Sequence, residues 1–385
     1  MDRDTIYLKS HFLYGEDFQY RKGILVIEDG IIKGFTGEHV RDPLCHRGVV
    51  IPPLINAHTH IGDNIIKDIG INKTLDELVK PPNGLKHRFL RSCSEEELIE
   101  GMLDGLEDLK DMGITYFCDF REGGLKGVNL LREAYSIFRR RYNWEFPYPL
   151  ILGRPTTSGR EELKREIEEI LKVADGIGLS GCNEYSDEEL KTIRKLDYKI
   201  FSIHANEHRG SIEYSKKVYG MSEIERIVNL KLQPTFIIHA TYTTPYEGEL
   251  LREEGIPVVV CPRANASFNV GLPDIHNLMD KGVLIGLGTD NFMANSPSIL
   301  KEMDFIYKLY HIDPREILRF STINNSRILG LEGVGLIEEG YRGIFTFIRD
   351  CPSIRYSRNI VASIITRCEK GDIVIYGGED DKGSS

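Results

Sequence analysis

Short apolar runs alternate with amphipathic segments through the middle of the chain. Continuous apolar runs separated by helical periodicity are typical of parallel strands that are buried on both faces. The candidate strands are residues 49–57, 114–120, 148–153, 176–179, 199–204, 235–239, 256–261 and 283–288. Eight strands that alternate with helices predict an α/β protein built on a (β/α)8 (TIM) barrel. An open doubly wound sheet is less favoured, because no Gly-rich phosphate-binding fingerprint follows the first strand.

Capping residues mark where several of the intervening helices begin. Ser94, Ser186 and Ser222 are each followed three residues later by a glutamate. This spacing is the capping box, in which the serine and the glutamate satisfy backbone N–H groups at the start of a helix. The sequence therefore predicts helices directly after these three serines.

Both ends of the chain have a different pattern, rich in β-branched and aromatic residues. The N-terminal candidate strands are residues 5–8, 23–28 and 30–35, and Asp29-Gly30 is a strong hairpin signal. The C-terminal candidate strands are residues 344–348, 359–366 and 372–376. We therefore expect one small β-sandwich domain formed from both chain termini, residues 1–50 and 340–385, beside a barrel over residues 51–339.

Composition narrows the function classes. The 385 residues carry a formal net charge of −10, whereas nucleic-acid and anionic-membrane binders need clustered Lys and Arg. No apolar run is long enough to span a bilayer, and the first residues do not form a secretory signal. The seven cysteines contain no CxxC pair, so neither a disulfide framework nor a zinc ribbon is indicated. We expect a cytoplasmic protein that acts on a small molecule, without nucleic-acid or membrane partners.

Candidate metal ligands stand at the ends of the predicted barrel strands, where barrel enzymes place their chemistry. His58 and His60 are two apart, so the period of a strand puts both side chains on the same face. His204 ends the fifth strand, His239 the sixth and Asp290 the eighth. Imidazole and carboxylate ligands with an open position are typical of a catalytic site for zinc or ferrous iron.

Each of these residues also has an ordinary structural interpretation. His239 could be a hydrogen-bonded core histidine and Asp290 a helix cap. Glu207, which follows His204 by three residues, could be a solvated loop residue. The His58–His60 pair alone is about as often structural as ligating. Four strand ends that each carry a ligand-type residue favour the metal site, with His58, His60, His204 and Asp290 as the ligands.

The ordered motifs resemble the amidohydrolase superfamily, and within it the branch of mononuclear-metal deaminases and chlorohydrolases that includes nucleoside, guanine and cytosine deaminases. They are Pro-Leu-Ile-Asn-Ala-His-Thr-His at 53–60, His-Ala-Asn-Glu at 204–207, His239, Cys-Pro-Arg-Ala-Asn-Ala at 261–266, Gly-Thr-Asp-Asn at 288–291 and the stretch 322–330. Binuclear relatives carry a bridging lysine after the fourth strand, and residues 176–182 contain none. The resemblance implies one divalent ion, with zinc expected and ferrous iron as the alternative. By analogy with its relatives, the protein could form a homo-oligomer.

The resemblance also implies catalytic roles. Metal-activated hydroxide would attack the substrate, Asp290 would accept the proton of the attacking water and His239 would steady the developing oxyanion. Glu207, three residues after ligand His204, would protonate a ring nitrogen. We therefore expect a hydrolytic deaminase of an amino-substituted heterocycle such as a purine, pterin or pyrimidine derivative. The alternatives are a hydrolase of a cyclic amide or another C–N bond, and a barrel that binds a metal or small molecule without catalysis.

The sequence says least about the substrate. Arg121, Glu122 and Arg154 follow the second and third strands and are the candidate substrate-binding residues. The loop after the first strand is basic, with Lys80, Lys86, His87 and Arg88, and has none of the aromatic residues usual in nucleoside deaminases. These basic groups either grip an anionic part of the substrate or pair with neighbouring Asp and Glu, and the second interpretation is favoured for the loop.

Overall fold

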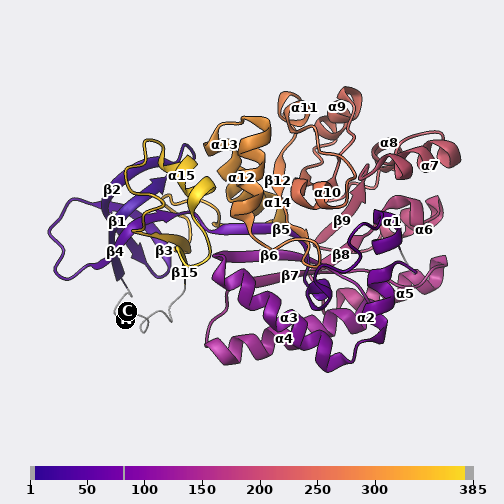
Figure 1. Cartoon of the computed structure of the whole chain (residues 1–385), viewed down its shortest axis with the longest axis horizontal. Helices are drawn as coiled ribbons and strands as arrows, with labels where there is room; N and C mark the ends of the chain where they lie inside the picture. The colour runs from indigo at the N-terminus through magenta and orange to yellow at the C-terminus, as the bar shows by residue number, and fades with distance from the viewer. Residues whose placement is uncertain (1–4, 81–82, 378–385) are drawn as a thin grey trace.

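In the computed structural model, which describes residues 5–80 and 83–377, the chain forms two separate sheets. Figure 1 shows a small β unit on the left, in which the indigo N-terminal strands lie beside the yellow C-terminal ones, and a larger α/β unit on the right. The fold class predicted from the sequence is confirmed. The domain boundaries stay a prediction, and residues 1–4 and 378–385, assigned to the small domain, lie outside the described residues.

The small unit is a six-stranded mixed sheet of order β15-β14-β4-β1-β2-β3. Its strands are β1 (Thr5–Tyr14), β2 (Gln19–Glu28), β3 (Ile31–Thr36), β4 (Leu44–Ile51), β14 (Phe345–Arg349) and β15 (Ile373–Tyr376). β1 pairs with β4 in parallel, and the other neighbours are antiparallel. Asp29 and Gly30 join β2 to β3 with φ angles of 51° and 74°, as a tight two-residue hairpin requires.

The larger sheet has parallel strands throughout and closes on itself. Its strands are β5 (Leu54–His60), β6 (Ile114–Arg121), β7 (Tyr148–Gly153), β8 (Gly176–Leu179), β9 (Ile200–Ala205), β10 (Phe236–His239), β11 (Val258–Val260), β12 (Ile285–Leu287) and β13 (Asp290–Asn291). The order runs β12-β11-β10-β9-β8-β7-β6-β5-β13. β13 follows β12 after two residues and pairs with β5, so the two short strands together occupy the eighth position of the barrel.

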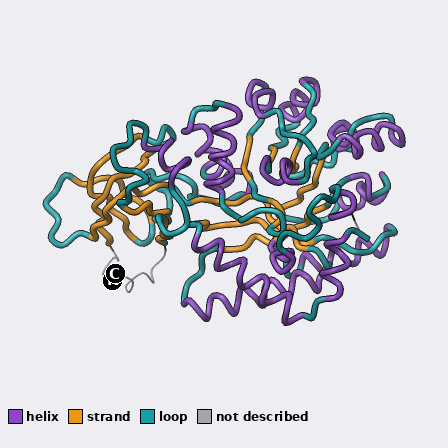
Figure 2. Tube along the Cα trace, in the orientation of Figure 1, coloured by secondary structure: helices purple, strands orange, loops and turns teal. Residues whose placement is uncertain are grey.

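Helices surround this sheet, as the purple segments of Figure 2 show. Their bounds are η1 (Ile61–Ile66), α1 (Leu75–Val79), α2 (Leu85–Ser92), α3 (Glu95–Asp111), α4 (Gly124–Tyr142), α5 (Arg160–Leu171), η2 (Cys182–Glu184), α6 (Asp187–Ile193), α7 (Arg209–Tyr219), α8 (Glu223–Asn229), α9 (Pro245–Glu253), α10 (Pro262–Ser267), α11 (Ile275–Asp280), α12 (Ile299–Tyr310), α13 (Pro314–Ser321), α14 (Ile323–Leu329) and α15 (Ile360–Arg367). The predicted capping boxes at Ser94, Ser186 and Ser222 are all present. Among the described helices, none is long and apolar enough to cross a membrane.

Two predicted strands are wrong in detail. The run 49–57 is two strands, because Pro52 and Pro53 lack the N–H group that a sheet ladder needs. β4 ends at Ile51 in the small sheet, and β5 begins at Leu54 in the barrel. The run 359–366 is helix α15. Its N-cap is Asn359, whose side chain accepts a hydrogen bond from the N–H of Ala362. Its β-branched residues indicated a strand, but Val361, Ile364 and Ile365 lie on one helical face and pack into the core.

A candidate metal centre at the strand ends

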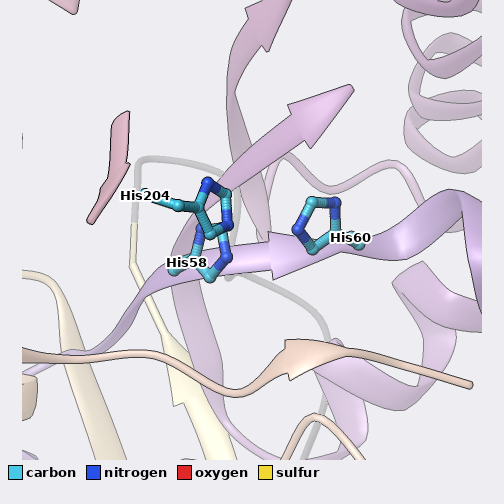
Figure 3. Close-up of side chains that lie close together, drawn as sticks. All are labelled: His58, His60 and His204. Atoms are coloured by element: carbon cyan, nitrogen blue, oxygen red, sulfur yellow. The ribbon is translucent and has the colours of Figure 1, made fainter. Parts of the chain in front are cut away.

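Five buried ligand-type side chains meet at one end of the barrel. β5 supplies His58 and His60, β9 supplies His204, β10 ends at His239 and β13 begins at Asp290. Ligand atoms of His58, His60 and His204 lie within 4.8 Å of one another, and so do those of His58, His239 and Asp290. Figure 3 shows the ring of His204 beside that of His58, with His60 further along β5.

Hydrogen bonds behind the ligands fix which ring nitrogen faces the centre. The Nδ1–H of His204 donates to Leu179 O at 2.8 Å and that of His60 to Phe120 O at 3.1 Å. His239 Nδ1 bonds to Asn265 Oδ1 at 3.1 Å. Each contact leaves Nε2 free to bind a cation, which is how proteins usually orient ligating histidines.

His58 is the clearest sign that a cation belongs here. It is fully buried, and neither ring nitrogen has a hydrogen-bond partner among the described residues. An unpartnered buried polar group costs about 1–3 kcal/mol. Two unpartnered nitrogens on one buried ring therefore indicate a ligand that the protein itself does not supply. A metal bound through Nε2, which lies 3.3 Å from Asp290 Oδ1, would satisfy that nitrogen and the carboxylate together. The donor set of imidazoles and one carboxylate fits zinc or ferrous iron.

The electrostatics of the cluster give the protonation states that metal binding needs. Burial lowers the pKa of His58 to about 3 and holds that of His204 well below its usual value. Burial alone would raise the pKa of Asp290, but the neighbouring histidines outweigh it and lower that pKa. At neutral pH, His58 and His204 are therefore neutral and Asp290 is ionised, which is the ligating form of each side chain.

The backbone is strained where the ligands leave their strands. His239, Ala240 and Asp290 have φ angles of 71°, 46° and 59°, and Asn206, two residues after ligand His204, has 50°. Non-glycine residues adopt this left-handed region rarely, and such strain concentrates at functional sites. Asn206 is held there by its N–H bond to Glu223 Oε2 at 2.9 Å and its side-chain bond to Glu247 Oε1 at 3.0 Å.

Glu207 lies at the edge of this cluster. Its side chain is 18% exposed, and its Oε1 is 3.6 Å from His239 Nε2. The carboxylate therefore adjoins the metal-binding groups and still reaches solvent, which is the position a group needs to exchange protons with a bound molecule. The catalytic role of Glu207 stays a prediction.

The candidate substrate-binding residues fall into two environments. Arg121 and Glu122 are buried and paired, with Arg121 Nη2 2.8 Å from Glu122 Oε2 and Glu122 Oε1 2.9 Å from His60 Nδ1. Arg154 has 11% of its side chain exposed and one long contact, 3.4 Å from Nη2 to Glu184 Oε2. Arg154 is therefore better placed than Arg121 to contact a substrate. The assignment of Arg121, Glu122 and Arg154 to substrate binding stays a prediction.

Three of the four basic residues in the loop after β5 have partners within the protein. Lys80 pairs with Asp76 at 2.9 Å, His87 Nε2 bonds to Val79 O at 2.9 Å, and the buried Lys86 ammonium lies 2.9 Å from Asp63 Oδ2. These contacts agree with the ion-pair interpretation of the loop. Sequence reasoning missed the partners Asp63 and Asn265, because each is an ordinary polar residue until the fold brings it to the ligands.

Comparison with known proteins agrees with this geometry. The model of the amidohydrolase family matches residues 49–374. An uncharacterized protein of Methanocaldococcus jannaschii is 58% identical over 378 residues, covering 96% of this chain and 97% of its own. A 5-methylthioadenosine/S-adenosylhomocysteine deaminase of Pyrococcus furiosus is 27% identical, covering 86% and 82%. The crystal structure of a zinc-bound adenosine deaminase from Xanthomonas campestris superposes with a TM-score of 0.81 at 16% identity, covering 97% and 91%.

The match to the family model spans most of the chain, and the metal-binding cluster lies within it. The recognition of the family and its deaminase branch from the sequence motifs is thereby confirmed. This chain belongs to the amidohydrolase family and is a metal-binding hydrolase that acts on carbon–nitrogen bonds.

Proposed function

We propose that the protein is a zinc-dependent hydrolytic deaminase of an amino-substituted heterocycle, with a purine-type ring as the favoured substrate. The observation that carries the proposal is the Glu207 carboxylate 3.6 Å from His239 Nε2, at the open edge of the metal-binding cluster. Relatives whose names specify deamination of adenine-containing compounds support the purine ring. The zinc-bound neighbour supports zinc over ferrous iron.

The reaction replaces an exocyclic amine by oxygen, so a water molecule enters and ammonia leaves. A bound divalent ion supplies Lewis acidity and lowers the pKa of coordinated water toward about 7. Asp290 is ionised and accepts a proton from the attacking water. Glu207 delivers a proton to the ring nitrogen beside the amine, which makes the adjacent carbon electrophilic. His239 hydrogen-bonds the oxygen that is added. Asp290 passes its proton to the departing amine, which leaves as ammonia, and Glu207 regains a proton from the added hydroxyl group as the ring C=O forms.

Glu207 is also what favours deamination over the hydrolysis of a cyclic amide. Protonation of a ring nitrogen is needed when the leaving group is an amine on an aromatic ring, and a positioned acid contributes about 10²–10⁴-fold. Arg154 is proposed to contact an anionic or hydroxylated part of the substrate, because its ion pair within the described part of the chain is long, at 3.4 Å from Glu184 Oε2. A homo-oligomer and a cytoplasmic location stay predictions.

The direct test is ammonia release by metal-quantified protein across a panel of amino-purines, nucleosides, pterins and pyrimidines. Turnover of at least one member supports deamination. Product without ammonia would identify another hydrolase of the family, and a metal-loaded protein that turns over no member would favour a binding protein.

The residue test is Glu207→Gln, which keeps the shape of the side chain and removes the transferable proton. We expect it to retain the metal and to lose about 10²–10⁴-fold in kcat. Glu213→Gln, the same change at an exposed position of α7, is the matched control and should keep full activity. Near-normal turnover in Glu207→Gln would reject the role assigned to this carboxylate.

A further inference from the structure

A fully buried ammonium group lies beside the metal centre, on the connection between β5 and α3 (residues 61–94, of which 81 and 82 are not described). It belongs to Lys86 of α2, whose side chain is 2% exposed. Its Nζ lies 2.5 Å from Glu122 Oε1 and 2.9 Å from Asp63 Oδ2. The lysine thus joins two carboxylates that are themselves buried, with exposures of 8% and 0%.

The carboxylate of Glu122 contacts a metal ligand directly. Glu122 Oε1 is also 2.9 Å from His60 Nδ1, on the side of the ring that faces away from Asp290. Arg121 Nη2 holds the other carboxylate oxygen at 2.8 Å. The Nδ1–H of His60 therefore faces both Phe120 O, at 3.1 Å, and the Glu122 carboxylate. A carboxylate behind a ligating histidine helps to fix the ring and raises the basicity of the nitrogen that binds the metal.

The carboxylate of Asp63 contacts the strand that carries Asp290. Asp63 Oδ2 accepts a bond from Asn291 Nδ2 at 2.7 Å, and Asp63 Oδ1 accepts one from the N–H of Met293 at 2.9 Å. These two residues follow Asp290 in the chain, and β13 is only two residues long. Asp63 is therefore one of the groups that hold the Asp290 backbone in place.

Stability alone does not account for this arrangement. A buried ion pair is expensive to desolvate, and a well-packed apolar residue of the same volume is often as stabilising. Without Lys86, Glu122 would keep Arg121 as a cationic partner, but Asp63 would lose the one cation that pairs with it among the described residues, in a region of low dielectric. Lys86 places one positive charge between two carboxylates that lie behind two different metal ligands.

We propose that Lys86 is a positioning residue of the metal centre. It fixes the His60 ring through Glu122 and the Asp290 backbone through Asp63 and Asn291, and it ties the connection between β5 and α3 to both. The proposal depends on the metal centre and not on the identity of the substrate. It would therefore stand if the protein proved not to be a deaminase, and it could be wrong even if the protein is a deaminase.

The test measures zinc affinity of metal-stripped protein by competition with a chromophoric chelator, without any substrate. We expect Lys86→Met and Glu122→Gln each to weaken zinc binding by about 10–100-fold, the usual effect of removing a partner behind a ligand. Lys80→Met is the matched control, because Lys80 lies in the same connection but is 66% exposed, and its ion-pair partner among the described residues is Asp76 on the protein surface. Its zinc affinity should equal that of the parent protein.

Two further measurements separate positioning from a general structural role. In the double variant Lys86→Met/Glu122→Gln, the loss should be smaller than the product of the single losses, because both act through His60. The visible spectrum of the cobalt-substituted protein should change in Lys86→Met and be restored in Lys86→Arg. If Lys86→Met does not fold, Asp63→Asn and Glu122→Gln carry the same measurements. A folded Lys86→Met protein with parental zinc affinity and cobalt spectrum, or fully multiplicative losses, would overturn the proposal.

Discussion

Asn325 of α14 closes the barrel, and replacing it with alanine should be among the most damaging single changes outside the metal centre. Its side chain is completely buried between β5 and β12. Nδ2 donates to Ile55 O at 2.7 Å and to Leu287 O at 2.8 Å, and Oδ1 accepts from the N–H of Leu287 at 2.9 Å. Gly286 makes room for it, since a Cβ there would lie 2.3 Å from Asn325 Oδ1.

The magnitude follows from the groups left without partners. Alanine removes all three bonds, and each buried backbone group that loses its partner costs about 1–3 kcal/mol. The sum is about 3–6 kcal/mol if part of the loss is recovered by relaxation, against a total stability of about 5–15 kcal/mol for a typical domain. Because Asp290 lies three residues beyond Leu287, zinc affinity should fall in the same variant.

Urea unfolding followed by circular dichroism measures the loss, and the neighbouring Asn324 supplies the control. Asn324 Nδ2 makes one part-buried bond, to Ile285 O at 2.8 Å, so Asn324→Ala should cost only about 1 kcal/mol. Equal losses in the two variants, or a loss below 1 kcal/mol in Asn325→Ala, would refute the argument that these bonds close the barrel.

Three other outcomes are expected. Removal of the metal with a chelator should abolish activity and lower the unfolding free energy, and zinc at 100 times its dissociation constant should restore about 2.7 kcal/mol; an apo-protein of unchanged stability would contradict a site built around the ion. Arg154→Leu should raise KM about 10–100-fold for a substrate with an anionic group and leave kcat nearly unchanged, as expected for a charged hydrogen bond of about 1.5–3 kcal/mol; equal KM values for both proteins would remove Arg154 from substrate binding. Burial raises the pKa of Glu302 from 4.5 to about 8, against the opposing effect of Arg263, so the folded state holds a proton that the unfolded state releases. Its contribution to the free energy of unfolding is complete below pH 4.5 and is lost as pH rises through 8, by on the order of 5 kcal/mol; unfolding at pH 5 and pH 8.5 should show most of this decline in the parent protein and a flatter profile in Glu302→Gln.

The sequence by itself determined the barrel and most of the metal cluster. His58 and His60 share a face because the side-chain period of a strand is two. The ends of parallel barrel strands meet at one rim, so His204, His239 and Asp290 could be assigned to the same place from strand order alone. These inferences succeed because they depend on local periodicity and on a topology that repeats.

The tertiary structure decided the features that depend on contacts between distant segments. Lys86 is one of several basic residues in its loop, and its sequence context does not separate it from the exposed Lys80. Likewise, the β-branched residues of α15 suit a strand as well as a helix until the core selects the helix. Burial and pairing are set by what the rest of the chain places around a residue, and for that reason Lys86, Glu122 and Asp63 became one network only in the folded protein.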